Sequence, residues 1–369
     1  MPGNKNLNSA AKAKNDEFYT QFDDINRELN CYLEYDENVF RDKTILLPCD
    51  DPHFSKFTKF FALKFKDYGI KKLISTSYAV NSKKFQMPKQ LSLFEENFPQ
   101  YDPTIDDLRG KIYTLDSESI KTNKYPPDAL QWEYLEGDGD FRSDEVKKLR
   151  DEADVIITNP PFSLFREFLN WIIEGDKKFL IISNKNCITY KEVFPLIKDD
   201  KIWSGARKWQ GGMWFRSADD DYFDKIIHGE KMKNTPAIWL TNLEHGRRHQ
   251  PMILATMADL VKHNKHKTAR ENLYKKYDNY DAIEVPFTDL IPEDYEGVMG
   301  VPITFLDRYC PEQFEILGIT DRQNTSGLRT KIYTKDDSLK YNDLNARSVL
   351  KINNEYHQVY ARLLIRHRR

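Results

Sequence analysis

Five short apolar runs recur along the chain up to about residue 243, and each is bounded by polar or turn-forming residues. They span 43–49, 71–78, 153–159, 177–183 and 236–242. Apolar runs of this length are typical of buried strands. Beyond the third run one helix face is apolar, formed by Leu164, Phe165, Phe168, Leu169, Ile172 and Ile173. This alternation of strand and helix predicts an α/β fold with a mostly parallel sheet that is covered on both faces.

Two other regions break the alternation. Residues 81–131 are polar, contain prolines and show little periodicity, so we expect an insertion there. After residue 244 the sequence is first irregular and basic, and patterns of mixed strands and helices follow. We therefore expect one domain over 1–243, which carries the insertion, and a second region over 244–369.

The composition excludes several classes of protein. With 40% hydrophobic and 31% charged residues, the 369-residue chain is typical of a soluble globular protein. A net charge of −2 argues against a uniformly basic, histone-like protein. The four cysteines form no C-x-x-C pair, so neither a disulfide framework nor a metal site is predicted. Neither a signal peptide nor a membrane span is apparent, and we expect a cytoplasmic protein.

The third run, "DVIITNPPFSLF" (154–165), ends in an unusual way. It places Asn159-Pro160-Pro161-Phe162 at the carboxyl end of a strand, where open α/β sheets bind ligands. The two prolines fix the backbone and remove two donors, which is expected to leave their carbonyls without local partners. The amide oxygen of Asn159 and the carbonyl of Pro160 would then accept hydrogen bonds from one amino group, while Phe162 offers a flat face to a planar ring. A simple strand-terminating turn is the alternative.

Asn-Pro-Pro-Phe after a strand resembles the signature of S-adenosylmethionine-dependent enzymes that methylate amino groups. Further stretches resemble the EcoRI-type adenine-N6 DNA methyltransferase family, in the same order along the chain: "NDEFYTQ" (15–21), "CDDP" (49–52), "GDGDFRS" (137–143), "TNPPFSLF" (158–165), "ITYKEVF" (188–194), "WLTNL" (239–243), "KYDNYDAI" (276–283) and "GVMGVPITFL" (297–306). The resemblance implies a class I, Rossmann-like methyltransferase with a mixed, mostly parallel seven-stranded sheet and a C-terminal target-recognition region. It also implies S-adenosyl-L-methionine as cofactor. Asn159, Pro160, Pro161 and Phe162 would form the catalytic loop, with Asn159 also at the cofactor.

The resemblance further suggests which segments hold the methionine end of the cofactor. Phe18-Tyr19-Thr20 would fold over it, although Phe18 and Tyr19 could instead pack against the helix that follows. Cys49 and Asp50 lie in the loop after the first strand. Asp51-Pro52 is explained by a helix start, with Asp at the N-cap and Pro at the first helical position. Asp50 is therefore expected to bind the ammonium group.

"GDGDFRS" is the segment that resembles an adenine-binding loop. Asp140 would bind the amino group of the cofactor's adenine and Phe141 would lie against its ring, with Asp138 as a substitute for Asp140. A helix capped by Ser143 is the alternative explanation of this stretch. The second strand, "ISTSYAV", ends without an acid for the ribose, so that contact has no assigned residue.

A basic stretch from 244 to 280 favours nucleic acid as the substrate. It contains Arg247, Arg248, Lys262, Lys265, Lys267, Arg270, Lys275 and Lys276. Such clustering suits contacts with phosphates, although a solvated charged face explains any single lysine. The segment 280–369 has the size of a target-recognition region. The resemblance points to double-stranded DNA, with GAATTC or a related palindrome as the target.

One short motif lies inside the expected insertion. "QLSLF" (Gln90–Phe94) resembles the peptide by which bacterial proteins bind the replication sliding clamp, and a hydrophobic tether to the domain explains it equally well. We expect a monomer that methylates adenine N6 in duplex DNA. An RNA adenine methyltransferase and a DNA-binding module without catalysis are the alternatives.

Overall fold

The computed structural model describes residues 19–52, 55–79, 101–102, 104–106, 108–118, 132–209, 211–216, 223–227, 229–267, 271–322 and 328–368. The chain divides into two compact units. Unit 1 consists of Met1–Lys185 and Gly205–His245, and unit 2 of Asn186–Ser204 and Gly246–Arg369. The expected boundary at 243/244 lies next to the division at 245/246, whereas the sequence did not predict that 186–204 belongs to the C-terminal unit.

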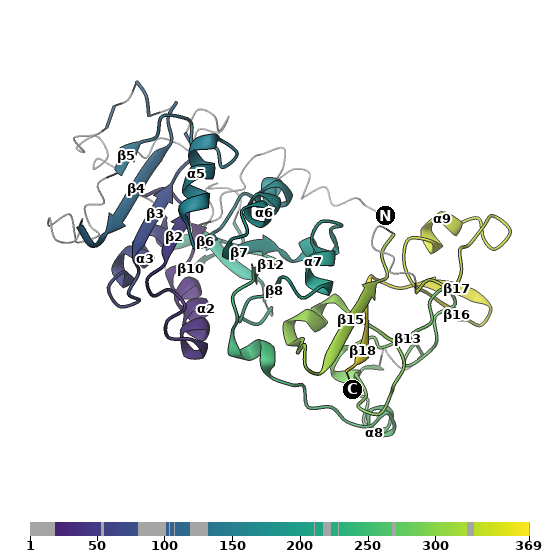
Figure 1. The fold of residues 1–369 in the computed structure, drawn as a ribbon. Helices are drawn as coiled ribbons and strands as arrows, with labels where there is room; N and C mark the ends of the chain where they lie inside the picture. Colours follow the sequence, from purple (N-terminus) through teal and green to yellow (C-terminus); the bar gives the residue numbers. More distant parts are fainter. Residues whose placement is uncertain are drawn as a thin grey trace. The chain divides into compact units, whose positions relative to one another are not determined.

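A large mixed sheet organises unit 1 (Figure 1). Seven of its strands belong to unit 1: β2 (Thr44–Leu47), β3 (Lys72–Thr76), β4 (Lys111–Asp116), β5 (Trp132–Tyr134), β6 (Val155–Thr158), β7 (Lys178–Asn184) and β12 (Ala237–Thr241). The eighth, β8 (Trp203–Ser204), comes from the segment 186–204 that is counted with unit 2. Their order is β5-β4-β3-β2-β6-β7-β12-β8. The central strands β3, β2, β6 and β7 pair in parallel, while β4, β5 and β12 pair with their neighbours in antiparallel fashion.

The sheet is buried on both faces, as the sequence predicts. Among the described residues of unit 1, the helices are α2 (Phe22–Tyr35), α3 (Lys56–Lys64), α5 (Asp144–Glu152) and α6 (Phe165–Glu174), the last preceded by the 3-10 turn η4 (Phe162–Leu164). Residues of α2 and α3 form one apolar cluster with Ile45 and Ile157 of the sheet. Leu46 and Ile156 alternate with these and are also fully buried, so the opposite face is covered as well.

A second, antiparallel sheet lies in unit 1. It has the order β1-β9-β11-β10, with β1 (Tyr19–Thr20), β9 (Met213–Arg216), β10 (Lys225–Ile227) and β11 (Glu230–Thr235). Near it, the buried carboxylate of Glu28 in α2 accepts hydrogen bonds from the backbone nitrogens of Ala206 (2.7 Å) and Arg207 (2.9 Å) and from the Tyr32 hydroxyl (2.9 Å). Burial raises the pKa of Glu28. This carboxylate ties the start of the 205–245 segment to α2.

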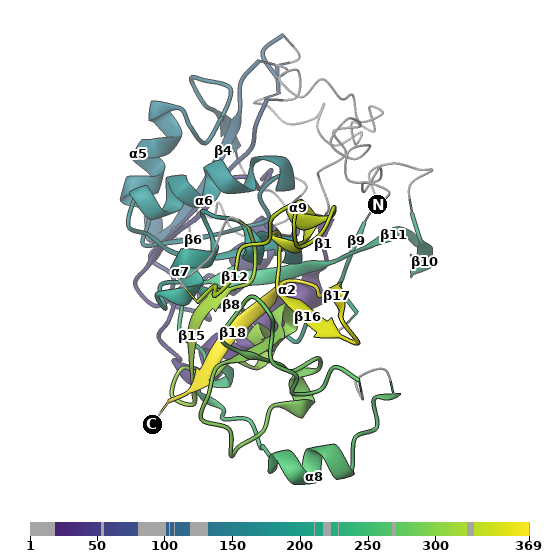
Figure 2. The same cartoon turned by 90° about the vertical axis from the view of Figure 1, so that its right-hand side faces the viewer.

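Unit 2 contains two small sheets and short helices. Apart from β8, its described strands are β13 (Ile283–Glu284), β14 (Met299–Pro302), β15 (Phe314–Ile319), β16 (Val349–Ile352), β17 (Glu355–Gln358) and β18 (Arg362–His367). Its described helices are α7 (Phe194–Lys198), α8 (Met257–Lys262), α9 (Tyr341–Leu344), η6 (Gly246–His249), η8 (Thr288–Leu290) and η9 (Ile303–Arg308). One further 3-10 helix, η5 (Lys185–Thr189), spans the division between the units. The sheets have the orders β13-β14-β18-β15 and β16-β17. Within this unit α9 and the hairpin β16–β17 lie together, and α8 lies at the opposite end (Figure 2).

The observed elements confirm the α/β prediction and correct several details. Each of the five apolar runs contains a strand, but the sheet has eight strands rather than seven. Strand β4 lies inside 81–131, so that segment is not wholly an insertion. Helix α3 begins at Lys56, and its N-cap is Ser55 rather than Asp51. Within the described residues, no helix is long and apolar enough to cross a membrane.

Candidate active site

Four loops of unit 1 meet at one edge of the large sheet. Because β3, β2 and β6 are parallel neighbours, the loops that follow them leave from the same edge. The antiparallel strand β4 begins there, since Thr76 at the end of β3 pairs with Ile112. The loop 135–140 is joined to this edge by hydrogen bonds from Ala79 N to Asp138 O (2.8 Å) and from Gly110 N to Gly137 O (3.0 Å). Loops after β2, β3 and β6 and the loop 135–140 therefore form a common site.

Asp50 lies at the centre of this edge, in the loop after β2. One carboxylate oxygen accepts a hydrogen bond from the Ser55 hydroxyl (2.6 Å) and the other from the Thr158 hydroxyl (2.6 Å). Its backbone carbonyl accepts a hydrogen bond from the Ser75 hydroxyl. The side chain is 6% exposed. Asp50 thus connects β2, β3 and the last residue of β6, and two hydroxyl groups fix its carboxylate at this edge.

The loop after β6 continues into a helix, although by an irregular route. Asn159 and Pro160 follow the strand, and Pro161 is the N-cap of the 3-10 turn η4. The carbonyl of Pro161 accepts a hydrogen bond from Leu164 N (3.0 Å), so the expectation that both proline carbonyls lack local partners is wrong for Pro161. Phe162 is half-buried and packs against the core of unit 1. Since Thr158 binds Asp50, the residue before Asn159 is anchored to the loop after β2.

Two glycines allow the loop 135–140 to approach β3 closely. Gly139 has φ +79°, and a Cβ atom there would lie 2.2 Å from the Ser77 carbonyl oxygen. A Cβ on Gly110 would lie 2.4 Å from the same oxygen and 2.8 Å from the Cα of Gly139. A side chain at either position would collide with backbone. This close packing places Asp138 beside the end of β3, where the sequence itself has no acid.

Asp140 and Phe141 have partners of their own in this loop. The Asp140 carboxylate accepts hydrogen bonds from the Arg142 side chain, Nε at 2.9 Å and Nη2 at 2.7 Å, and from the Arg142 backbone nitrogen at 2.8 Å. The Arg142 side chain holds the pKa of Asp140 below its usual value. Phe141 is 5% exposed, and its ring makes edge contacts with Phe168 and Trp171 at centroid distances of 5.1 and 5.7 Å. This packing accounts for the burial of Phe141.

The structure gives contacts for most of the other predicted site residues but does not describe Phe18. The Asp138 carboxylate accepts a hydrogen bond from Asp140 N (3.0 Å), and Ser143 caps α5, as the alternative explanation expected. Cys49 is half-buried in the turn after β2. Phe18, expected over the methionine end of the cofactor, lies outside the described residues. Tyr19 and Thr20 form β1, whose backbone pairs with Arg216 and Phe215 of β9.

Three polar residues of the site were not found from the sequence. Ser55 and Thr158 bind the Asp50 carboxylate, and Ser75 binds its backbone. Thr158 lies directly before Asn159 and could have been suspected for that reason. Ser55 and Ser75 carry no such signal, because their role depends on the folded positions of α3 and β3.

The basic stretch of unit 2 separates into internal and exposed residues. Arg248 is 5% exposed, lies over the Trp203 ring at 3.7 Å and binds Asp200 at 2.6 Å. Arg247 binds Asp307 at 2.8 Å. A phosphate contact does not fit the buried Arg248. Exposed side chains are those of Lys262, Lys265, Lys267, Lys275 and Lys276. Arg270 and the Gln90–Phe94 motif lie outside the described residues.

Comparisons with known proteins agree with the resemblance in sequence. The family model for the adenine-specific methyltransferase EcoRI matches residues 6–368. The type II methyltransferase M.EcoRI of Escherichia coli is 41% identical over 325 residues, which cover 85% of this chain and 89% of that protein. The type II methyltransferases M.MpnI of Mycoplasma pneumoniae (33% identical, 84% of each chain) and M.MgeORF184P of Mycoplasma genitalium (31% identical, 98% of each chain) are also similar. No solved structure matches the chain. The chain therefore belongs to the EcoRI family of adenine-specific methyltransferases.

Proposed function

We propose that this protein transfers the methyl group of S-adenosyl-L-methionine to the N6 amine of an adenine flipped out of duplex DNA. We further propose that it is the modification enzyme of a type II restriction-modification system. The observation that carries the proposal is the position of Asn159–Phe162 at the carboxyl end of β6, joined through Thr158 to the carboxylate of Asp50. Loops at this edge are where open α/β sheets bind ligands.

The catalytic loop acts by orienting the target amine. The amide oxygen of Asn159 and the carbonyl of Pro160 each accept a hydrogen bond from one of its N–H groups, which directs the nitrogen lone pair away from both acceptors. Pro161 fixes the turn, and Phe162 stacks on the flipped base. The bound cofactor supplies an electrophilic methyl group. Positioning of this kind lowers the barrier without a side chain of shifted pKa.

The residues at the sheet edge fit the cofactor. A buried carboxylate at Asp50 suits the ammonium group, because a charge-assisted hydrogen bond is strong where water is excluded. Cys49 flanks this position, and Tyr19 and Thr20 with Phe18 would cover the methionine end. Gly110 and Gly139, packed against the Ser77 carbonyl, hold the loop 135–140 and its acids close to the end of β3.

The acids of the 135–140 loop complete the proposed cofactor site. Asp138 and Asp140 are both candidates for the adenine amino group, with Phe141 beside the ring. Because Arg142 donates three hydrogen bonds to the Asp140 carboxylate, Asp138 gains support as the residue that binds the adenine amino group in its place. Its place beside Ala79 at the end of β3 supports it further.

Duplex DNA is the proposed substrate, and GAATTC or a related palindrome the proposed target. Flipping a base costs a few kcal/mol. Stacking on an aromatic ring offsets about 1 to 3 kcal/mol of that cost. The exposed lysines of unit 2 supply contacts with phosphates. A DNA substrate places the enzyme in the cytoplasm, and a clamp contact through Gln90–Phe94 remains a separate prediction.

Labelled S-adenosylmethionine provides the decisive test. The wild-type protein is incubated with duplex DNA, single-stranded DNA and RNA, and the products are sequenced for N6-methyladenine. We expect label in duplex DNA at one short sequence, and none with Asn159→Ala, while binding of the cofactor is measured separately by calorimetry. Transfer to RNA or to protein alone would contradict the proposal. Wild-type rates with Asn159→Ala would contradict the catalytic role of the loop.

A further inference from the structure

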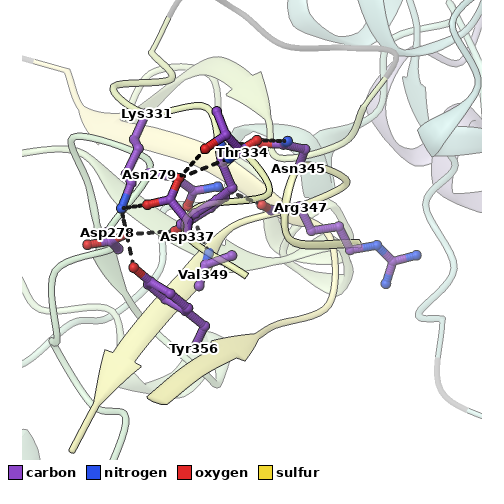
Figure 3. Close-up of polar contacts among 10 residues, drawn as sticks. Asp278, Asn279, Lys331, Thr334, Asp337, Asn345, Arg347, Val349 and Tyr356 are labelled. Atoms are coloured by element: carbon purple, nitrogen blue, oxygen red, sulfur yellow. Dashed lines mark hydrogen bonds and ion pairs between the residues drawn. The ribbon is translucent and has the colours of Figure 1, made fainter. Parts of the chain in front are cut away.

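The motif "KYDNYDAI", part of the resemblance to the family, forms a structural hub in unit 2 that the proposed chemistry does not use. Asp278 accepts hydrogen bonds from the Tyr333 hydroxyl (2.8 Å) and from Lys331 Nζ (3.2 Å). Lys331 also binds Asp337 (3.2 Å) and lies 4.7 Å from the centre of the Tyr333 ring. Although desolvation lowers it, the hydrogen bonds to Asp278 and Asp337 raise the pKa of Lys331 overall. Figure 3 shows the contacts of Lys331 with Asp278 and Asp337. The hub therefore holds the segment 331–337 in place.

The neighbouring Asn279 fixes the backbone on both sides of Ser348. Its amide nitrogen donates to the Arg347 carbonyl (2.8 Å), and its amide oxygen accepts from Val349 N (2.8 Å). Asn279 is fully buried. Asn345 in turn binds both backbone groups of Tyr333, at 2.9 and 2.8 Å. The segment 345–349 is thus held at two points by buried or half-buried amides, and Arg347 has little backbone freedom.

The side chain of Arg347 is directed away from this hub (Figure 3). Among the arginines that the structure describes in unit 2, only Arg308 and Arg347 have a guanidinium without a hydrogen bond or ion pair. Arg308 is exposed, whereas Arg347 is half-buried. Its guanidinium lies 6.0 Å from the ring of Tyr360, which is 79% exposed. Arg347 therefore carries its guanidinium on a fixed backbone segment, without an ion pair to any residue that the structure describes.

We propose that Arg347 reads a guanine in the target sequence through the major groove, and that Asn279 is its positioning residue. The inference rests on the proposed DNA substrate. Arginine binding both O6 and N7 of guanine is the commonest specific contact between a side chain and a base. An arginine whose backbone is already fixed loses less conformational entropy when its guanidinium binds. A proposed GAATTC-type site contains one G·C pair at each end. The exposed lysines near α8, at the other end of unit 2, serve phosphates instead.

The test measures discrimination rather than activity. The target of the wild-type enzyme is first identified by sequencing its methylated products. Binding and kcat/KM are then measured on that duplex and on duplexes changed at one base pair each. We expect Arg347→Ala and Arg347→Lys to lose roughly 5- to 150-fold of the discrimination at one G·C pair, the range for one bidentate contact. Discrimination at the other positions is retained.

Two further variants separate this role from others. Arg308→Ala removes an equally unpaired arginine from unit 2 and should leave discrimination unchanged. Asn279→Asp keeps the acceptor for Val349 but loses the donor to Arg347, so it should lower discrimination at the same base pair by a smaller factor. If Arg347→Ala instead weakened binding to all duplexes by the same factor and reduced the slope of log K against log salt by about 1, Arg347 would be a phosphate contact. That result would overturn the proposal. Unchanged discrimination would overturn it too. A wild-type enzyme that methylates no DNA would instead refute the proposed function.

Discussion

At the scale of single residues, Phe162 combines two tasks, because its ring is half-buried against the core and still proposed to stack on the target base. We predict that Phe162→Ala raises KM for DNA by a factor that corresponds to about 1 to 3 kcal/mol of lost stacking. Fluorescence of 2-aminopurine at the target position reports the flipped base directly. Leu164→Ala, in the same 3-10 turn, is the matched control. An equal rise of KM in both variants would assign the effect to local packing.

The pair of Asp140 and Arg142 predicts a dependence of stability on pH. The pKa of Asp140 in the folded protein lies below its value in the unfolded chain. The pair therefore stabilises the fold fully at pH values above the unfolded pKa, and this stabilisation is lost as the pH falls through the folded pKa. The Arg142 side chain is 52% exposed, so the contribution at neutral pH is about 1 kcal/mol or less. The difference in unfolding free energy between the wild type and Arg142→Gln should shrink between about pH 5 and 3.

Urea unfolding at several pH values measures this difference. Lys147→Gln is the control, since its ion pair with Asp144 is long, at 3.7 Å, and the acid is 95% exposed. The difference between this variant and the wild type should be small at every pH. A constant difference for Arg142→Gln from neutral to acid pH would refute the prediction.

Sequence patterns predict position best for residues whose contacts are local. Asn159 to Phe162 follow one strand and form one loop, and the structure places them there. Asp50 was chosen because Asp51 was expected to cap a helix, yet Ser55 caps it. The choice of Asp50 now rests on its contact with Thr158, which lies 108 residues away. Contacts over such separations depend on the pairing of strands and leave no mark in a local pattern.

At the scale of elements, strands with continuous apolar runs were predicted correctly and β4 was missed. The buried side chains of β4 are Lys111, Tyr113 and Leu115. Because one of these buried positions is a lysine, the sequence lacks the alternation of apolar and polar residues that indicates a strand. The structure makes the buried lysine tolerable, because Lys111 binds Asp106 at 3.0 Å and lies 4.5 Å from the centre of the Trp132 ring. Trp132 belongs to another strand, and although Asp106 lies shortly before Lys111, no helix or strand periodicity pairs the two.

The contact between the loop 135–140 and β3 yields a prediction for one glycine. We expect Gly139→Ala to destabilise the protein by roughly 2 to 5 kcal/mol, because it adds a collision with the Ser77 carbonyl to the strain of a positive φ. Gly229→Ala is the control, since Gly229 has φ +82° and a Cβ atom there would meet nothing within 4 Å, so only strain of about 1 to 2 kcal/mol remains. Unfolding in urea measures both. Equal losses would show that the close approach costs nothing.

At the scale of the whole molecule, a net charge of −2 means that affinity for DNA must come from local positive charge. We predict that replacing Lys262, Lys265 and Lys267 together with glutamine makes the slope of log K against log salt shallower by up to about 2.7, which is three phosphate contacts. Fluorescence anisotropy at several salt concentrations measures the slope. Lys276→Gln should change it less, because Lys276 already binds Asp281 at 2.7 Å. An unchanged slope in the triple variant would place the phosphate contacts elsewhere.

The bond between Asp50 and Thr158 has a consequence for protein engineering. A hydrogen bond joins the loop after β2 to the end of β6, so the loops after β2 and β6 should be exchanged together when segments are swapped between related enzymes. A chimera that imports a foreign segment from Asn159 onward while changing residue 158 to an apolar one would leave the Asp50 carboxylate short of a donor. Grafts intended to change the target amine should therefore transfer Asp50 and Thr158 together with the loop.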